Sequence, residues 1–577
     1  MKRSRFTSHL LVTLALSLLI YSMLPSIRLQ AGERRISRDV QDLLANMTLE
    51  EKIGQLLMVG FNGDTPGPDA LTLVETYHAG GVVLFNWSDN LKNPVQTANL
   101  TNGLQKMAHI PLLIAVDQEG GSVARMSSAS STVFPGNMPL GAVNSPRLAY
   151  ETGRMTGEEL WAVGINMNLA PSLDVNTNPA NPVIGIRSYG ERPELVASLG
   201  AETIKGMQQQ VVTVAKHFPG HGDTNVDSHT GLPVISKTAQ QIAEEDLVPF
   251  QKAISDDIDA IMTAHIHVPA LDPTPKRPAT LSKPILTGLL REKLGYQGLI
   301  MTDSLTMAGA RAVGGIPQAA VQALEAGADL LLLSPEMSVA DQIEVFLEIK
   351  KAWEEGVLTE GRIDQSVVRI LEVKRRHDLL TPQQVDLNDL PQHLGTAQHR
   401  NKAQQVANQA VTLLRNEGDL LPLRLRPEQK LAVISQYPML PFIKSYHENT
   451  TELHIKPLKP SPALISRAMQ LAEGADAIVI GTYNATQHAQ QTQLVRALQA
   501  STNKPVIVIA FGTPYDLKEF PTVPGYLATY GAREEQVNAA VEALFGKLNP
   551  SGHLPVTIPQ VAAYGTGLSY HKNFWGR

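Results

Sequence analysis

The chain of 577 residues is too long for one ordinary hydrophobic core, and its 43% hydrophobic and 18% charged content excludes wholesale disorder and a polytopic membrane protein. Its 49 basic and 55 acidic side chains give a formal net charge of −6, so there is no electrostatic reason to expect a nucleic-acid partner. The absence of cysteine excludes disulfides, thiolate metal sites and a cysteine nucleophile.

Residues 1–31 have the outline of a signal peptide. Lys2, Arg3 and Arg5 precede an apolar run over residues 10–24, and residues 29–31 offer a small-residue cleavage site. An uncleaved membrane anchor is the alternative, although the apolar run is short for spanning a bilayer. In both cases we expect the body of the chain to be exported.

Eight apolar runs of strand length follow in chain order, each trailed by a segment with helical periodicity. They are rich in Val, Ile and Leu rather than strictly alternating, which is typical of parallel strands buried on both faces. Eight such units between residues 36 and 380 predict an α/β fold, a (β/α)8 TIM-type barrel, with a doubly wound open sheet as the alternative. The runs are 53–61, 81–85, 112–117, 166–175, 211–217, 260–265, 299–303 and 330–333.

Residues 381–400 are polar and contain proline, which predicts a linker between two domains. Beyond it, between residues 401 and 577, buried strands are predicted to alternate with helices such as 536–545. This pattern predicts a second, smaller α/β sandwich domain. Its predicted strands are 430–435, 475–482, 505–512 and 526–530.

Polar side chains gather at the downstream ends of several runs in the first domain. In a barrel the carboxyl ends of the strands meet at one face, where residues distant in sequence converge on a substrate. Each side chain alone could cap a helix or satisfy a loop, but together they predict a shared site. These residues are Asp117, Asp174, Lys216, His217, His265 and Asp303.

The densest polar segment runs from Lys216 to His229 and reads K-H-F-P-G-H-G-D-T-N-V-D-S-H. Near its end, Asp227 and His229 lie two residues apart in a loop rich in Gly, within reach of each other. A carboxylate beside an imidazole favours the imidazolium and makes it a better proton donor near neutral pH. The alternative is that both side chains only satisfy backbone groups of the loop.

The same segment supports a second hypothesis, a metal-dependent hydrolase on a barrel. A bound metal would activate water for amide, phosphoester or deamination chemistry. Chelator treatment separates the two hypotheses, because it abolishes only the metal-dependent reaction. The candidate ligands are His217, His221, Asp223, His229, His265 and His267.

The segment 216–229 is identical, at every specified position, to the K-H-F-P-G-H-G-D-T-x-x-D-S-H signature of the bacterial β-N-acetylglucosaminidases of glycoside hydrolase family 3. The resemblance extends in family order through D-Q-E-G-G at 117–121, R-S-Y-G at 187–190 and I-M-T-D-S-L at 300–305. Residues 407–422 and 549–555 resemble the second domain of the longer members. The sequence therefore resembles the two-domain, exported type of this branch.

The resemblance implies that Asp303 is the nucleophile that forms a covalent glycosyl-enzyme intermediate. It also implies that His229, polarised by Asp227, protonates the leaving oxygen and then activates water. Histidine would replace the carboxylic acid that retaining glycosidases ordinarily use. Contacts to the N-acetylglucosamine are implied for Asp117, Arg125, Arg187, Lys216 and His217.

The implied reaction is retaining hydrolysis of terminal, non-reducing β-linked N-acetylglucosamine from cell-wall fragments (muropeptides) or chitooligosaccharides, without a metal or organic cofactor. A β-glucosidase, a broad exo-β-glycosidase and a phosphorylase are alternatives within the family, and a sugar-binding protein without turnover is one outside it. Ser122 stands where many relatives carry arginine, which leaves the aglycone preference open. The second domain is expected to act as a buttress or as part of the substrate rim.

Overall fold

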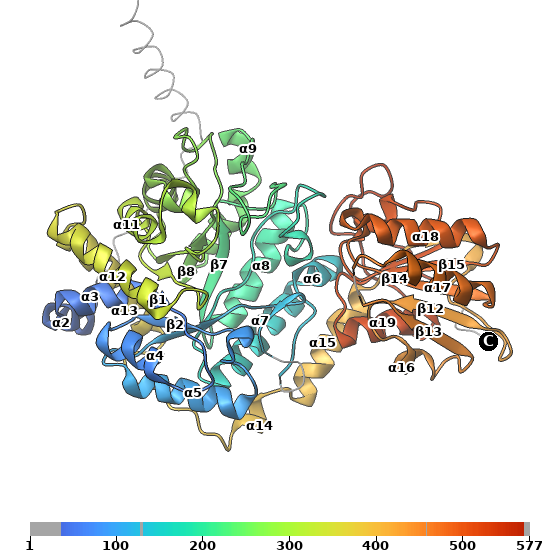
Figure 1. The fold of residues 1–577 in the computed structure, drawn as a ribbon, viewed down its shortest axis with the longest axis horizontal. Coiled ribbons are helices and arrows are strands. Elements are labelled where there is room, and N and C mark those ends of the chain that lie inside the picture. The colour runs from blue at the N-terminus through green and yellow to red at the C-terminus, as the bar shows by residue number, and fades with distance from the viewer. Residues whose placement is uncertain (1–35, 127–130, 457, 571–577) are drawn as a thin grey trace, which may run out of the picture.

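The computed structural model describes residues 36–126, 131–456 and 458–570. The predicted leader at residues 1–31 lies outside this part of the chain. Figure 1 shows two bodies side by side, each built around its own sheet, with α15 (Ala397–Ala410) between them. None of the helices within the described ranges is long and apolar enough to cross a membrane.

The first body is a parallel eight-stranded barrel, as predicted. The strands pair in the order β10-β1-β2-β3-β6-β7-β8-β9, and a parallel bridge between Met301 and Leu330 joins the two ends. An open doubly wound sheet has no such closure, so the alternative is wrong. The strands are β1 (Leu57–Val59), β2 (Gly81–Val83), β3 (Leu113–Val116), β6 (Met167–Asn168), β7 (Val212–Phe218), β8 (Ala260–Thr263), β9 (Leu299–Thr302) and β10 (Leu331–Leu332).

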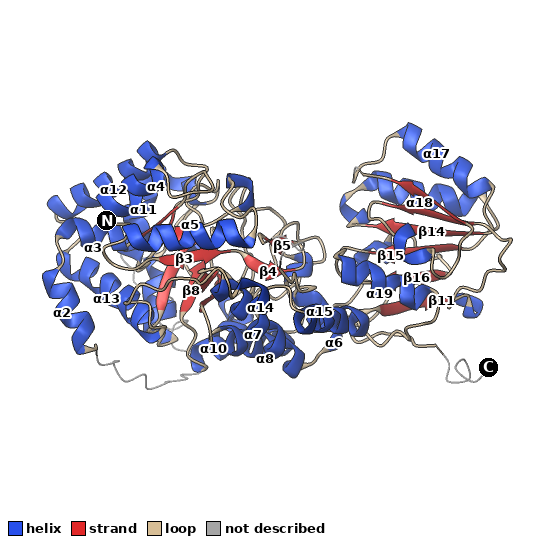
Figure 2. Ribbon diagram, turned by 90° about the horizontal axis from the view of Figure 1, so that it is seen from below, coloured by secondary structure: helices blue, strands red, loops and turns tan. Residues whose placement is uncertain are grey.

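Every residue of these eight strands is buried, because the barrel interior covers one face of the sheet and helices cover the other (Figure 2). This two-sided burial is why the sequence shows continuous apolar runs instead of alternation. The first predicted run, 53–61, is wrong at its start. Residues 53–55 belong to α3 (Leu49–Gln55), which begins at a capping box between Thr48 and Glu51.

The helices around the barrel follow the strands in the expected βα order. A π-helical segment over Pro284–Lys293 occupies the connection between β8 and β9. The α-helices are α2 (Arg38–Asn46), α3, α4 (Pro68–Leu71), α5 (Pro94–Met107), α6 (Asn137–Val143), α7 (Pro146–Ala162), α8 (Pro193–Met207), α9 (Ala239–Glu244), α10 (Leu247–Ser255), α11 (Ile316–Ala326), α12 (Val339–Glu354) and α13 (Glu360–Arg376).

The second body is a six-stranded sheet between two layers of helices, which confirms the predicted α/β sandwich. The strand order is β11-β16-β15-β14-β12-β13, and only β11 runs antiparallel to its neighbour. Apolar side chains of α17 and α18 pack on one face, and those of α16 and α19 pack on the other. The elements are β11 (Thr412–Asn416), β12 (Leu431–Ser435), β13 (Thr450–His454), β14 (Ala477–Thr482), β15 (Val506–Ala510), β16 (Gly525–Ala528), α16 (Leu440–Ile443), α17 (Pro462–Glu473), α18 (Ala489–Ser501) and α19 (Glu534–Leu544).

The segment between the two bodies contains one short helix, α14 (Leu390–His393), between the end of α13 and the start of α15. The helix α15 packs against α6 of the barrel and against α19 of the second domain. It therefore joins the two domains through side-chain packing as well as through the chain.

Candidate active site

A cavity of about 140 Å³ lies at the carboxyl ends of the barrel strands. It brings together side chains from loops that are far apart in the sequence, as the barrel geometry requires. Asp227 does not line the cavity, but it contacts His229, which does. Seven of the eight residues expected to be catalytic or to bind the sugar line the cavity, namely Asp117, Arg125, Arg187, Lys216, His217, His229 and Asp303.

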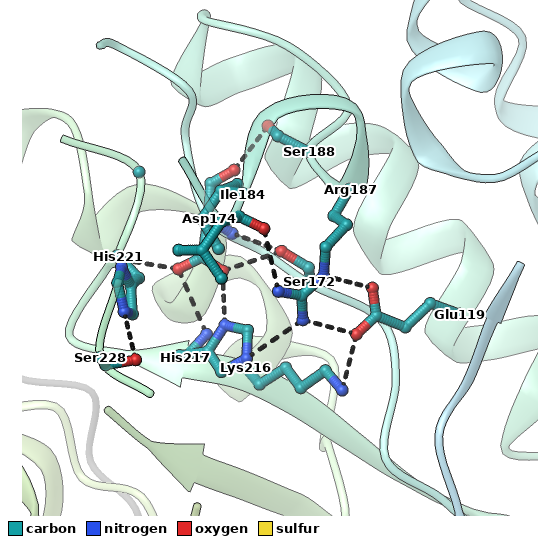
Figure 3. Close-up of polar contacts among 12 residues, drawn as sticks. Glu119, Ser172, Asp174, Ile184, Arg187, Ser188, Lys216, His217, His221 and Ser228 are labelled. Atoms are coloured by element: carbon teal, nitrogen blue, oxygen red, sulfur yellow. Dashed lines mark hydrogen bonds and ion pairs between the residues drawn. The ribbon is translucent and has the colours of Figure 1, made fainter. Parts of the chain in front are cut away.

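One wall of the cavity is a buried cluster of charges (Figure 3). Arg187 donates two hydrogen bonds to Glu119, of 2.9 Å from Nε and 2.7 Å from Nη2. Lys216 Nζ lies 2.7 Å from Glu119 Oε1 and 2.7 Å from Asp117 Oδ1. The side chains of Glu119 and Lys216 are only 2% and 3% exposed, so these ion pairs are shielded from water and hold the wall in one arrangement.

The pKa values of Glu119, Arg187 and Lys216, the most buried groups of this cluster, shift toward the charged forms. For Glu119, burial raises the pKa, but the charges of Arg187 and Lys216 and their hydrogen bonds outweigh burial and hold it well below the ordinary value. For Lys216, burial lowers the pKa, and the carboxylates of Asp117 and Glu119 outweigh that effect and raise it. The cluster therefore stays ionised at neutral pH.

A second buried group positions the loop that carries the Asp227/His229 pair. Asp174, which is 0% exposed, lies 2.7 Å from His217 Nδ1 through Oδ2 and accepts a 2.7 Å hydrogen bond from the backbone N–H of His221 through Oδ1 (Figure 3). His221 then reaches the hydroxyls of Thr224 and Ser228, each at 2.9 Å. These contacts tie both ends of the loop together directly before His229.

Asp227 and His229 form a close pair at the mouth of the cavity. Asp227 Oδ1 lies 2.6 Å from His229 Nδ1 and also accepts a 2.9 Å hydrogen bond from the His229 backbone N–H. Burial raises the pKa of Asp227, but these hydrogen bonds and the charge of His229 outweigh burial and lower it. An ionised Asp227 accepts a hydrogen bond from Nδ1–H of His229, which leaves Nε2 of the exposed ring free to face a substrate.

Asp303 directly follows β9 and is partly buried against the cavity. Its Oδ1 accepts a 2.7 Å hydrogen bond from the backbone N–H of Ser304. Burial raises its pKa, but the imidazoles of His217 and His265, this N–H and the charge of Lys216 outweigh burial and lower it. The carboxylate is therefore ionised and able to act as a nucleophile at neutral pH.

The loop of His229 is fastened to the segment after Asp303. The backbone N–H of Gly309 donates a 3.1 Å hydrogen bond to Ser228 O, and that of Ala308 donates a 3.4 Å bond to His229 O. These two hydrogen bonds join the loop that follows β7 to the segment that follows β9. They therefore fasten the loop that carries His229 next to the segment that carries Asp303.

The histidines of the alternative metal hypothesis have other partners. His265 is buried between Thr280 and the carbonyl of Ser304, and His267 Nδ1 lies 3.1 Å from the carbonyl of Arg277. Among the residues that the structure describes, no group of three or more His, Asp or Glu side chains is arranged to hold a metal ion. The metal hypothesis therefore has no ligand set in the described part of this chain.

The sequence did not reveal the structural role of three residues of the site, namely Glu119, Asp174 and His221. In the D-Q-E-G-G motif only Asp117 was expected to bind the sugar, yet Glu119 of the same motif bridges Arg187 and Lys216. Asp174 was recognised as a polar strand-end residue without a role. A carboxylate within a mostly apolar segment is the signal that could have identified it, because a buried charge requires partners.

Replacing Glu119 by glutamine is expected to lower the free energy of unfolding by about 3 kcal/mol, because Arg187 and Lys216 would remain buried without their shared counter-charge. We also expect a raised KM, since both cations would turn toward the cavity. Urea unfolding measures the first effect and steady-state kinetics the second. As a control, Glu428→Gln removes one partner of a well-exposed ion pair with Arg426 and should leave both quantities unchanged.

The stability of the protein should fall as the pH is lowered through the titration range of these carboxyls. The pKa values of Glu119 and Asp174 in the folded state lie below their ordinary values of 4.5 and 3.8. When the pH falls below these ordinary values, the unfolded chain binds more protons than the folded one. His221, whose pKa burial lowers to about 4, adds a loss of stability between pH 6.5 and 4. The difference in the free energy of unfolding between the wild type and Glu119→Gln should therefore shrink below pH 4.5. A difference that stays constant with pH in urea titrations would contradict this.

The second domain contacts the loops that build the site. Tyr515 Oη lies 2.9 Å from Asn176 Nδ2, and Thr557 binds the Glu191 carboxylate through its N–H at 2.7 Å. Arg533 Nε donates a 2.7 Å hydrogen bond to the carbonyl of Gly121. Gly121 has a φ of 54°, and an added Cβ would lie 2.8 Å from a backbone oxygen, which explains the glycine in this turn.

Replacing Arg533 by alanine is expected to lower kcat/KM on an aryl glycoside by roughly tenfold, the effect of losing one charged hydrogen bond that holds the loop of Asp117 and Glu119. Arg496 offers a matched control, because it also donates to a backbone carbonyl but only within the second domain. Arg496→Ala should keep wild-type kinetics. Equal losses in both variants would mean that the effect is general destabilisation.

Comparison with known proteins matches both domains. The model of the glycosyl hydrolase family 3 N-terminal domain matches residues 48–373, and that of the C-terminal domain matches residues 411–575. "Beta-hexosaminidase A" of Pseudoalteromonas piscicida is 32% identical, over 89% of this chain and 97% of that protein. A "Beta-N-acetylglucosaminidase/beta-glucosidase" of Cellulomonas fimi is 28% identical, over 90% of this chain and 95% of that protein.

Among solved structures, a glycoside hydrolase family 3 β-N-acetylglucosaminidase from Paenibacillus sp. str. FPU-7 superposes with a TM-score of 0.84. It is 38% identical and covers 89% of this chain and 99% of that one. The matches run through both domains and agree with the signature at residues 216–229. The chain therefore belongs to glycosyl hydrolase family 3 and is a glycoside hydrolase.

Proposed function

We propose that this protein is a retaining exo-β-N-acetylglucosaminidase that cleaves terminal β-linked N-acetylglucosamine through a covalent intermediate on Asp303. The observation that carries the proposal is that the Asp303 carboxylate and the His229 imidazole line one cavity. The names of relatives that align along the full length, a β-hexosaminidase and a β-N-acetylglucosaminidase, support the choice of sugar.

In the first step, the Asp303 carboxylate attacks the anomeric carbon, and the bond from that carbon to the leaving oxygen breaks. His229 donates the proton on Nε2 to the leaving oxygen, so that the aglycone departs as an alcohol. Asp227, held 2.6 Å from Nδ1, stabilises the imidazolium before the transfer and keeps Nε2 directed at the cavity. The products are a glycosyl ester of Asp303 and a neutral His229.

In the second step, water replaces the aglycone. Nε2 of His229 takes a proton from the water as its oxygen attacks the anomeric carbon, and the ester bond to Asp303 breaks. Two inversions at the same carbon give net retention of the β configuration. Both groups return to their starting protonation states, so the cycle needs no co-reactant beyond water.

The charged wall supplies the contacts that hold the sugar. One carboxylate oxygen of Asp117 pairs with Lys216. The side chain is partly exposed to the cavity, where it can accept hydrogen bonds from sugar hydroxyls. The cavity of about 140 Å³ is smaller than the roughly 300 Å³ at which pockets for drug-sized ligands begin. This size favours a single sugar ring, and hence removal of one terminal residue at a time.

The proposed substrates are cell-wall fragments (muropeptides) or chitooligosaccharides, because the leader predicted at residues 1–31 would export the enzyme. Purified peptidoglycan fragments and chitooligosaccharides, compared by kcat/KM, would rank the two classes. Recovery of the protein from culture fluid and from cell fractions, with N-terminal sequencing, tests export and cleavage of the leader. Retention inside the cytoplasm would contradict the proposed location.

The proposal is tested by comparing an aryl β-N-acetylglucosaminide with an aryl β-glucoside and by following the released sugar with NMR. We expect the first substrate to be preferred and the β anomer to appear first. Mass spectrometry after a slow 2-fluoro or 5-fluoro sugar inactivator should find the label on Asp303. Preference for the glucoside, an α product, or sugar 1-phosphate as the main product in phosphate buffer would each overturn part of the proposal.

A further inference from the structure

Trp87 is conspicuous because of its exposure. Within residues 36–126, 131–456 and 458–570 it is the only Trp, Tyr or Phe side chain that is exposed, with 51% of its surface accessible. It lies in the short 3-10 turn Asn86–Ser88 after β2, on the face of the barrel that carries the catalytic cavity. Trp is enriched at binding interfaces, because its ring offers a large apolar surface together with one polar N–H group.

Hydrogen bonds of a buried asparagine stabilise the turn that carries Trp87. Asn90, which is 0% exposed, accepts a 3.1 Å hydrogen bond from the backbone N–H of Phe85 and donates to the carbonyls of Phe61 at 3.2 Å and Gly63 at 2.8 Å. The backbone that carries the indole is therefore held in place by buried hydrogen bonds. A preformed contact of this kind avoids the entropic cost of ordering a loop on binding.

Trp87 is connected to the cavity through two ring contacts. Its ring centroid lies 4.9 Å from that of Phe85, and the guanidinium of Arg125 lies 5.4 Å from the same Phe85 ring. Arg125 lines the cavity, with Nη2 3.7 Å from Asp117 Oδ2. Phe85 thus links the exposed indole to Arg125, a residue of the cavity lining that contacts Asp117.

We infer that Trp87 is the stacking platform for the sugar on the reducing side of the scissile bond. The inference rests on the proposed function, because a cavity that holds one ring places the next sugar of an oligosaccharide at its rim. One face of a pyranose presents C–H groups, which pack on an aromatic ring while the hydroxyls stay in water. Trp87 therefore favours substrates whose leaving group is itself a sugar.

The test compares two substrates that share the terminal sugar. Di-N-acetylchitobiose carries a sugar as its leaving group, and methyl β-N-acetylglucosaminide does not. In Trp87→Ala we expect the ratio of kcat/KM for the disaccharide to that for the methyl glycoside to fall on the order of tenfold, mainly through KM. Trp87→Phe should restore most of the ratio, because a smaller ring still stacks.

Leu347 on α12 is a matched control, because it is also 51% exposed and does not line the cavity. Leu347→Ala should keep the wild-type ratio. An unchanged ratio in Trp87→Ala, or an equal loss on both substrates, would overturn the inference. Wild-type enzyme that cleaves neither substrate would instead contradict the proposed function, so the two failures are distinguishable.

Discussion

Replacing Asp303 by alanine is expected to lower kcat/KM on an aryl β-N-acetylglucosaminide by at least about 10³-fold. The reason is that the covalent intermediate cannot form, while the buried wall of Glu119, Arg187 and Lys216 still binds the sugar. KM should therefore change much less than kcat. A thermal melt would show that the variant is folded.

Azide provides a sharper measurement on Asp303→Ala. The truncated side chain leaves room for a small anion, and His229 can still protonate the leaving group. Azide would then attack the anomeric carbon once, from the side of the missing carboxylate, and give the α-glycosyl azide. A β-glycosyl azide, or activity close to wild type, would assign the nucleophile to another residue.

Asp272 offers a control for the loss of a buried carboxylate. It is 2% exposed, accepts a 2.6 Å hydrogen bond from Ser282, and does not line the cavity. Asp272→Asn is expected to lower the melting temperature and to leave kcat unchanged. This contrast separates a chemical role of Asp303 from the general effect of disturbing a buried acid.

Replacing His229 by alanine is expected to lower kcat/KM on a disaccharide by about 10³-fold, within the range for loss of a general acid and base. The loss should be much smaller, about tenfold, for a dinitrophenyl glycoside in the glycosylation step, because that leaving group departs without a proton. The structural basis is the exposed Nε2 of a ring whose Nδ1 is held at 2.6 Å by Asp227. Rates across aryl leaving groups of different acidity measure the effect.

The product formed with azide distinguishes His229→Ala from Asp303→Ala. In His229→Ala the covalent intermediate still forms, and azide would attack it from the side of the missing imidazole to give the β-glycosyl azide. His267→Ala is the matched control, because His267 lies in a neighbouring loop outside the cavity. A loss that is the same for every leaving group would rule out proton transfer by His229.

Much of the fold could be predicted because parallel barrel strands are buried on both faces. Each of the eight apolar runs contains one strand, and the order of strands and helices along the chain led directly to the barrel. In the second domain the strands that were missed, β11 and β13, lie at the two edges of the sheet. β13 reads T-T-E-L-H and none of its residues is fully buried, so no apolar run marks it.

The site could be predicted in part, because strand ends and a local signature depend on short stretches of sequence. The placement of Asp117, Lys216 and Asp303 around one cavity follows from the rule that carboxyl ends of barrel strands meet. The pairing of Glu119 with Arg187 and Lys216 did not follow. It depends on how three segments distant in the sequence fold over one another, and a motif does not specify which way each side chain turns.

The sequence by itself determined the barrel, the second domain and the chemical groups at the strand ends, because these depend on burial patterns and motifs within a few residues. Only the tertiary structure decided which charges neutralise one another, that Asp174 and His221 hold the loop of His229, and that Trp87 is exposed beside Phe85. These features are contacts between distant segments. Their energies depend on distance and burial, which a linear sequence does not contain.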